Sequence, residues 1–435
     1  MNLLDAQLPD GWTWQSVSDR FRITKKPRER TIANFDAIPF VPMEGVPTNG
    51  REDVRFEIRT PGKIASGTYF EKGDILLSKI TPSFENGKQG LAKNIPADFG
   101  MASTEIIPLQ PLDAKSNRLF LFYYLLHPEV RFILAGKMEG STGRQRVPEN
   151  AVREFPLPVP PAPEQEKIAA VLWKVQRAIE TEEKLIATAC ELKQSVLRQL
   201  FSRGLRGEPQ KETEIGPIPE SWEIRPFQEF REFLQYGTSA KCDYHGKGNP
   251  VIRIPNITGG AVDTADLKWC ELSDREVTSI QLNDGDLLFV RTNGVRERVG
   301  SCAVYHEQPK GALFASYLIR ARLKVDELNP DFFQYYSMTP AGKSFLAGRA
   351  SPAADGKFNI NTKTIDAVLV PVPPSAARNE QDEIVGVLKT IDRKISVHER
   401  KRATLQELFK TLLHKLMAGQ IRIDKLDIDT SEVTI

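Results

Sequence analysis

The feature that most constrains this chain of 435 residues is that much of its sequence occurs twice. Short landmarks return in the same order about 210 residues later, with offsets that drift slowly. The matching pairs are 8–12 with 218–222, 73–77 with 285–289, 123–128 with 335–340, 158–161 with 371–374, and 164–168 with 380–384. Solenoid repeats have periods of roughly 20–50 residues. A period this long instead predicts two full domains in tandem, each carrying an appendage.

The first part of each copy, about 155 residues, has the pattern of a mixed α/β domain. Residues 74–80 and 286–292 follow glycine turns and predict strands. Residues 119–126 and 332–338 predict short helices that end before a proline, because the residue preceding a proline disfavours the helical conformation. We therefore expect an α/β (α+β) fold with a mainly antiparallel or irregular sheet.

The appendage of each copy is predicted to be one long helix. Residues 168–200 contain no proline or glycine, and each appendage follows a proline-rich segment and ends near a glycine, Gly204 or Gly419. Apolar residues recur on a seam with a period of 3.5 residues, which is typical of a coiled coil. The seam residues are Ile168, Leu172, Val175, Ile179, Ile186, Val196 and Leu200 in the first helix, and Ile384, Leu388, Ile391, Ile395, Leu405, Phe409, Leu412 and Leu416 in the second. We expect the two helices to pair, the alternative being that each packs on its own domain.

The charge balance excludes a uniformly basic surface, since 59 lysines and arginines stand against 57 acidic residues. Any nucleic-acid contact must therefore come from local clusters. The longest apolar run, 119–126, is far shorter than the ~18 residues of a membrane span. Residues 1–10 lack the pattern of a secretory signal. We expect a cytoplasmic protein that does not bind membranes.

No constellation typical of a metal site or an active site is found. The four cysteines are scattered, and only His245 lies near Cys242 at a metal-like spacing, without a second ligand pair. Residues 342–344 look like the end of a phosphate loop, but Ser337 stands where that motif needs glycine. Dinucleotide, zinc-protease and serine-hydrolase motifs are also missing. We expect no metal, no cofactor and no catalytic residue in this chain.

Polar and basic side chains gather in two loops at equivalent places in both copies. Arg, Asn and Gln have forked donors and acceptors that match guanine and adenine edges, whereas Lys and Thr suit phosphates. The candidate DNA-binding residues are Lys79, Thr81, Lys88, Gln89, Arg144, Gln145 and Arg146 in the first copy, and Arg291, Asn293, Arg296, Arg298, Lys357, Asn359 and Asn361 in the second. A further basic run, a candidate for the DNA backbone, contains Arg20, Arg22, Lys25, Lys26, Arg28 and Arg30.

A charge run is more often a solvated face than a DNA site, but the duplicated position of these loops favours a function. Residues 78–89 and 290–301 share little beyond a basic residue near the start, Lys79 or Arg291. One scaffold with two different loop sets predicts two different recognition surfaces. A protein that recognises a split, non-palindromic DNA sequence requires two different recognition surfaces.

With these features the chain resembles the specificity (S) subunit of type I restriction–modification enzymes. The resemblance covers nearly the whole chain and rests on 216–222, the 73–77 strand, 156–161 leading into Glu164 and Gln165, and 416–419. It implies two target-recognition domains that each read one half of a bipartite double-stranded DNA site, and an antiparallel helix pair that fixes the gap between the halves. The implied segments are 1–160 (first domain), 161–212 (central helix and linker), 213–374 (second domain), 375–423 (distal helix) and 424–435 (polar tail).

The resemblance also implies partner subunits. Two modification subunits would supply S-adenosylmethionine and methylate adenine, and restriction subunits would use ATP and Mg²⁺. Two features depart from the pattern. The second hinge, Pro374 to Glu380, is three residues longer than Pro161 to Glu164, and the net charge of +2 is modest for a DNA-binding protein. The alternatives are a stand-alone DNA-modifying enzyme of unfamiliar type and a coiled-coil adaptor that binds protein.

Overall fold

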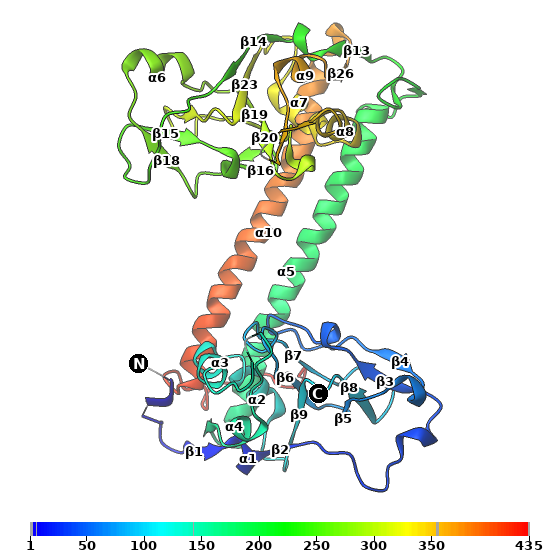
Figure 1. Cartoon of the computed structure of the whole chain (residues 1–435), viewed down its shortest axis with the longest axis vertical. Helices are drawn as coiled ribbons and strands as arrows, with labels where there is room; N and C mark the ends of the chain where they lie inside the picture. Colours follow the sequence, from blue (N-terminus) through cyan, green and yellow to red (C-terminus); the bar gives the residue numbers. More distant parts are fainter. Residues whose placement is uncertain (1–2, 6, 142, 354–355, 434–435) are drawn as a thin grey trace. The chain divides into compact units, whose positions relative to one another are not determined.

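The chain folds into two units that repeat one architecture, drawn from the computed structural model in Figure 1. The structure describes residues 3–5, 7–141, 143–353 and 356–433. One unit comprises Met1–Lys184 and His398–Ile435, and the other comprises Leu185–Val397. Each long helix therefore contributes a segment to both units. Within the described ranges, no helix is both long and apolar enough to cross a membrane.

The first unit contains two four-stranded β-sheets. One has the order β2–β9–β6–β7 and is antiparallel, and the other has the order β4–β3–β8–β5, in which β3 and β8 run parallel. The strands are β2 (Phe21–Ile23), β3 (Ile38–Val41), β4 (Glu57–Arg59), β5 (Thr68–Glu71), β6 (Ile75–Ser78), β7 (Gln89–Leu91), β8 (Phe99–Ala102) and β9 (Ile106–Pro111). All residues of β6 and β8 are buried, so both sheets contribute to the core.

The second unit repeats this arrangement, but its second sheet has three strands instead of four. One sheet has the order β14–β23–β19–β21 and is antiparallel, and the other has the order β18–β15–β22, in which β15 and β22 run parallel. The strands are β14 (Arg231–Tyr236), β15 (Asn249–Ile252), β18 (Lys268–Cys270), β19 (Leu287–Val290), β21 (Cys302–Val304), β22 (Leu313–Phe314) and β23 (Leu318–Leu323). The predicted mixed fold with a mainly antiparallel sheet is confirmed in both units.

In each domain a strand near the start pairs with the strand that precedes the long helix, and so closes the domain. β1 (Thr13–Ser16) pairs with β10 (Pro156–Val159), and β13 (Glu223–Pro226) pairs with β26 (Leu369–Val372). The remaining regular elements include α1 (Val17–Arg20), α4 (Glu149–Arg153), β11 (Gln210–Lys211), β12 (Ile218–Pro219), β16 (Ile257–Thr258), β17 (Ala261–Val262), α6 (Asp274–Ile280) and α9 (Thr362–Asp366).

The predicted short helices are present, and each is followed by a second helix. These are α2 (Arg118–Tyr124) with α3 (Pro128–Ala135), and α7 (Pro330–Ser337) with α8 (Pro340–Gly348). Pro128 and Pro340 each occupy the first turn of the following helix, where a proline costs no hydrogen bond. In α2 every residue from Leu119 to Tyr124 is buried, so this helix forms the centre of the core of its domain.

The two appendages are the longest helices, α5 (Ala162–Arg203) and α10 (Asn379–Met417). In the first unit, Ile168 and Leu172 of α5 share a core with Leu413 and Leu416 of α10. In the second unit, Leu200 of α5 shares a core with Ile384 and Leu388. The early residues of one helix thus meet the late residues of the other, and the segments run antiparallel and side by side (Figure 1).

The seam of this helix pair contains charged residues as well as apolar ones. Every predicted seam residue is buried or half-buried. Glu182, also on the seam and 3% exposed, accepts a hydrogen bond from His398 Nδ1 at 2.6 Å and lies 2.7 Å from Lys401 Nζ. Lys193 Nζ lies 2.6 Å from Asp392 Oδ1. The predicted pairing of the helices is confirmed, and both helices also pack on the domains at their ends.

A glutamate at the start of each long helix binds the segment that leaves the other helix. Glu164 accepts hydrogen bonds from Arg422 Nε and Nη2 at 2.8 and 3.0 Å. Its equivalent, Glu380, accepts a hydrogen bond from the Leu205 backbone N–H at 2.8 Å. The longer second hinge forms a 3-10 turn, Ser375–Ala377, before α10 begins.

Candidate nucleic-acid interface

The two predicted loops come together in each domain through equivalent backbone hydrogen bonds. In the first domain the Val147 N–H donates to the Lys79 carbonyl at 2.8 Å. In the second domain the Ile360 N–H donates to the Arg291 carbonyl at 2.9 Å. The loops were predicted separately, and the structure makes them neighbours.

A small three-stranded ladder surrounds this junction in the second domain. It consists of β24 (Ser351–Pro352), β25 (Phe358–Asn359) and β20 (Thr292–Asn293), with Asn359 opposite both Thr292 and Ser351. In the first domain Arg146 lies opposite both Ile80 and Glu139. Arg146 and Asn359 therefore occupy the same structural position.

A third segment, which the sequence analysis missed, joins the two loops. The Lys79 N–H donates to the Glu105 carbonyl at 2.9 Å, and the Arg291 N–H donates to the Tyr317 carbonyl at 2.9 Å. We use the term recognition frame for the three positions 79, 105 and 146 in the first domain and 291, 317 and 359 in the second. Glu105 and Tyr317 are 212 residues apart, as are the repeated segments 73–77 and 285–289. This shared offset was the signal from which the sequence could have identified them as equivalent positions.

In the first domain the frame carries an ion pair. Arg146 donates from Nε and Nη2 to the two carboxylate oxygens of Glu105, at 2.8 and 2.7 Å, and from Nη1 to the Arg144 carbonyl at 3.1 Å. The hydrogen bonds and charge of Arg146, helped by the charge of Lys79, hold the pKa of Glu105 below its ordinary value. Arg144 and Gln145 are exposed on the same hairpin.

In the second domain the frame carries aromatic and amide groups. Tyr317 is 56% exposed. The Arg291 guanidinium lies 4.8 Å from the ring centre of Tyr236 and donates to the Ser316 carbonyl at 3.3 Å. A cation over an aromatic ring is attracted by the ring's negative face. These two contacts hold the Arg291 side chain beside the exposed ring of Tyr236.

The other candidates of the second domain differ in exposure and in the local hydrogen bonds that they make. Arg298 and Lys357 are exposed. Arg296 is exposed too, but it donates to the carbonyls of residues 347 and 348 at 3.1 and 2.8 Å. The Asn293 side chain accepts from the Val295 N–H at 2.9 Å, and Asn361 caps α9 by accepting from the Thr364 N–H at 3.0 Å.

The prediction for Gln89 is wrong. This residue begins β7, is 1% exposed, and donates from its amide nitrogen to the Phe122 carbonyl at 2.6 Å, while its amide oxygen accepts from Arg131. A side chain bonded at both ends inside the core cannot reach a base. Lys88 is half-buried and donates to the Met43 carbonyl at 2.9 Å.

Thr81 and the basic run near the N-terminus are partly engaged in local contacts. The Thr81 hydroxyl hydrogen-bonds the Glu85 carboxylate. Arg30 donates to the Tyr69 hydroxyl at 2.8 Å and lies 4.6 Å from the ring centre of Phe99. Other contacts in the run link Arg20 to Asp113 and the Lys115 carbonyl, Arg22 to Gln110, and Lys26 to the Arg30 carbonyl. Lys25 and Arg28 are exposed.

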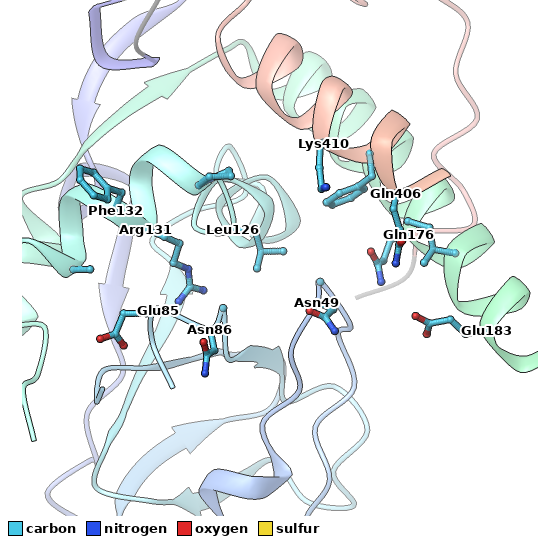
Figure 2. Close-up of a pocket in the computed structure, with 16 residues that line it drawn as sticks. Asn49, Glu85, Asn86, Leu126, Arg131, Phe132, Gln176, Glu183, Gln406 and Lys410 are labelled. Carbon is cyan, nitrogen blue, oxygen red and sulfur yellow. The ribbon is translucent and has the colours of Figure 1, made fainter. Parts of the chain in front are cut away.

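A cavity of about 670 Å³ lies in the first unit (Figure 2). Its lining mixes apolar and polar groups, among them Phe132, Leu126, Gln176 and Glu183. Arg131, at its wall, donates to the carbonyls of Leu125 and Phe84 as well as to Gln89, and so supports the fold. The described lining residues offer neither a nucleophile beside a base nor a set of metal ligands, and we do not assign chemistry to it.

Comparison with known proteins gives consistent matches over both halves of the chain. The family model described as type I restriction modification DNA specificity domain matches residues 9–189 and 219–407. The type I restriction enzyme EcoEI specificity subunit of Escherichia coli is 24% identical, over 94% of this chain and 82% of the relative. The EcoKI specificity subunit of Escherichia coli strain K12 is 26% identical, over 96% and 90%.

Solved structures show the same fold. The S subunit of a type I restriction–modification system from M. genitalium aligns with a TM-score of 0.56 at 17% identity, covering 94% of this chain and 97% of that chain. A chain from a study of complex assembly in a type I R-M system aligns with a TM-score of 0.54 at 20% identity, covering 95% and 100%.

Proposed function

This chain belongs to the family of type I restriction modification DNA specificity domains, and from that membership we propose that it recognises DNA sequence for a type I restriction–modification complex. One observation supports this most directly. The two recognition frames share their backbone hydrogen bonds but carry different side chains. The frame of the first domain has Lys79, Glu105 and Arg146, and the frame of the second domain has Arg291, Tyr317 and Asn359. Two different frames suit the two halves of a non-palindromic target.

The helix pair α5–α10 is proposed to set the number of unread base pairs between the half-sites. Its seam combines apolar residues with the ion pairs Glu182–Lys401 and Lys193–Asp392. A heptad seam tolerates shifts of whole heptads, and charged pairs such as these, each with one buried partner, select one register. A single register gives a single spacing.

The chain itself is proposed to be non-catalytic. Two modification subunits would bring S-adenosylmethionine and methylate adenine, and restriction subunits would bring ATP and Mg²⁺. The net charge of +2 supports sharing of the phosphate contacts with such partners. The curated relatives carry the name specificity subunit of type I restriction enzymes, which supports the same division of labour.

The test is to delete the gene for this chain and to map methylated adenines in the genome. We expect one bipartite motif to lose methylation and to regain it when the chain is restored. An intact methylation pattern after deletion would refute the proposal.

Two further measurements separate the alternatives. Binding of S-adenosylmethionine by the pure chain would favour an enzyme, and the absence of any salt-dependent DNA binding would favour a protein adaptor.

A further inference from the structure

We propose that Arg146 reads a guanine in the major groove and that Glu105 is the positioning residue that aims it. This inference rests on the proposed function and adds a base and an atom-level contact to it. Position 105 was not among the residues that the sequence suggested.

A guanidinium has five N–H groups, one on Nε and two on each Nη. Glu105 takes the Nε group and one on Nη2, and the Arg144 carbonyl takes one on Nη1. Among the bonds to described residues, one N–H therefore remains on each Nη nitrogen. An arginine that donates once from each Nη nitrogen can meet two acceptors at once, and guanine O6 and N7 are such an acceptor pair in the major groove.

The carboxylate also decides against a phosphate as the main target. Glu105 stays ionised because Arg146 and Lys79 lower its pKa. Its negative charge, 2.7 Å from Arg146 Nη2, offsets the positive charge of the guanidinium and repels a phosphate. A guanine edge is neutral overall and presents two acceptors. With a guanine, Arg146 therefore gains two hydrogen bonds, and Glu105 causes little electrostatic repulsion.

The backbone fixes the carboxylate before DNA arrives. The carbonyl of Glu105 accepts from the Lys79 N–H at 2.9 Å, and its N–H donates to the Ser103 hydroxyl at 3.3 Å. Arg146 is opposite Ile80 in the same ladder. An arginine loses much rotamer freedom when it is immobilised on binding, and a clamp in the free protein removes part of that cost.

The second domain has a different reader at the same position. Asn359 replaces the arginine and Tyr317 replaces the glutamate. Asparagine offers one donor and one acceptor, the pattern that matches adenine N6 and N7. The second half-site is thus expected to be indifferent to changes at 105 and 146, and it serves as the internal folding control for every variant.

The experiment uses the full chain assembled with its modification subunits and a randomised double-stranded DNA library. The variants are Arg146→Ala, Glu105→Gln and the matched control Arg144→Ala, which removes an exposed arginine from the same hairpin. For Arg146→Ala we expect a roughly 5- to 150-fold loss of preference at one G·C pair of one half-site, with the other half-site unchanged. Glu105→Gln should weaken the preference at that same pair. Arg144→Ala should lower affinity evenly and reduce the salt dependence.

A chemical probe then tests the contact atom. The guanine at that pair is replaced by 7-deazaguanine, which lacks the N7 acceptor. The unaltered complex should lose affinity for this DNA, whereas the Arg146→Ala complex should be insensitive to the replacement. Equal weakening of all sequences by Arg146→Ala, or equal sensitivity of both complexes to 7-deazaguanine, would overturn the inference while leaving the proposed function standing. An unaltered complex with no sequence preference at all would overturn both.

Discussion

Asp74 and Asp286 occupy the same place in the two repeats and are each 1% exposed, but only Asp286 is paired with arginines. Asp286 accepts two hydrogen bonds from Arg322 at 2.8 Å and lies 3.5 Å from Arg320. Burial raises the pKa of Asp74 to about 7, although Thr24 and the Glu71 backbone bond to it. The same position of the repeat is thus part of an ion pair in one domain and, in the other, a buried acid whose hydrogen bonds and the charge of Arg118 do not offset the effect of burial.

The raised pKa of Asp74 predicts that the stability of the first domain depends on pH. The folded pKa of Asp74 lies above its unfolded value of about 4, so its contribution favours folding at low pH and is lost as pH rises from about 4 to 7. The loss is at most about 4 kcal/mol. We expect Asp74→Asn to remove this pH dependence. Hydrogen exchange of the β6 amides across the pH range measures it.

The matched control is Asp286→Asn. This change leaves Arg320 and Arg322 without their carboxylate, so it should destabilise β19 at neutral pH. A pH dependence in β6 that survives Asp74→Asn would show that another group is responsible.

A second prediction separates the two domains by substitution. Replacing both Arg144 and Arg146 by alanine should weaken the sequence preference at only one half-site. Replacing both Arg291 and Arg296 by alanine should weaken the sequence preference at only the other half-site. Each lost bidentate base contact costs ~1–3 kcal/mol. The methylated motif of each double variant is the readout. If both double variants weaken all DNA equally, the residues contact phosphates and the loop assignment is wrong.

A third prediction concerns catalysis. The isolated chain is expected neither to methylate nor to cut DNA, since neither the sequence nor the described side chains present a catalytic constellation. The measurement is transfer of a labelled methyl group, and nicking, by chain purified free of partner subunits. Turnover that disappears when a residue of this chain is changed would contradict the prediction.

A fourth prediction treats the helix pair as a ruler. Lys193 is opposite Asp392, and Glu182 is opposite His398, so Ala189 is nearly level with Ile395. Four residues inserted after each of Ala189 and Ile395 would lengthen both helices by about 6 Å, and a coiled-coil seam accepts such a stutter. The unread gap should widen by one or two base pairs, while both half-sites keep their sequence.

The control for this insertion is to lengthen only one helix. Four extra residues after Ala189 alone would separate Lys193 from Asp392 and misalign the seam, so assembly should weaken. Maps of methylated adenines give the spacing. An unchanged gap with full methylation in the doubly lengthened protein would exclude a ruler.

The helices and their seam could be predicted because their signal is local and repeated. A period of 3.5 residues over more than thirty positions leaves few alternatives, and Leu172, Leu200, Ile384 and Leu416 are buried as expected. The duplication likewise predicted two copies of one fold, since each landmark confirmed the others.

The site could be predicted only in part, because residue type does not reveal which way a side chain faces. Gln89 has the chemistry of a base reader, but Arg131 needs an acceptor inside the core and Gln89 supplies it. Glu105 was missed because it lies 26 residues after Lys79 in the sequence and is joined to it by a backbone hydrogen bond. A backbone hydrogen bond cannot be predicted from the pattern of side chains.

The reciprocal contacts of Glu164 and Glu380 have a consequence for the connectivity of the chain. In the first unit the segment that leaves α10 is held to the start of α5 by Glu164 and Arg422, across residues far apart in sequence. In the second unit Glu380 holds the segment that leaves α5, which there continues directly into the second domain. The same junction thus forms with and without a covalent connection. The two junctions are equivalent, so a protease cut in the exposed linker near Arg206 should leave two fragments that stay associated, and a circularly permuted chain opened there should fold.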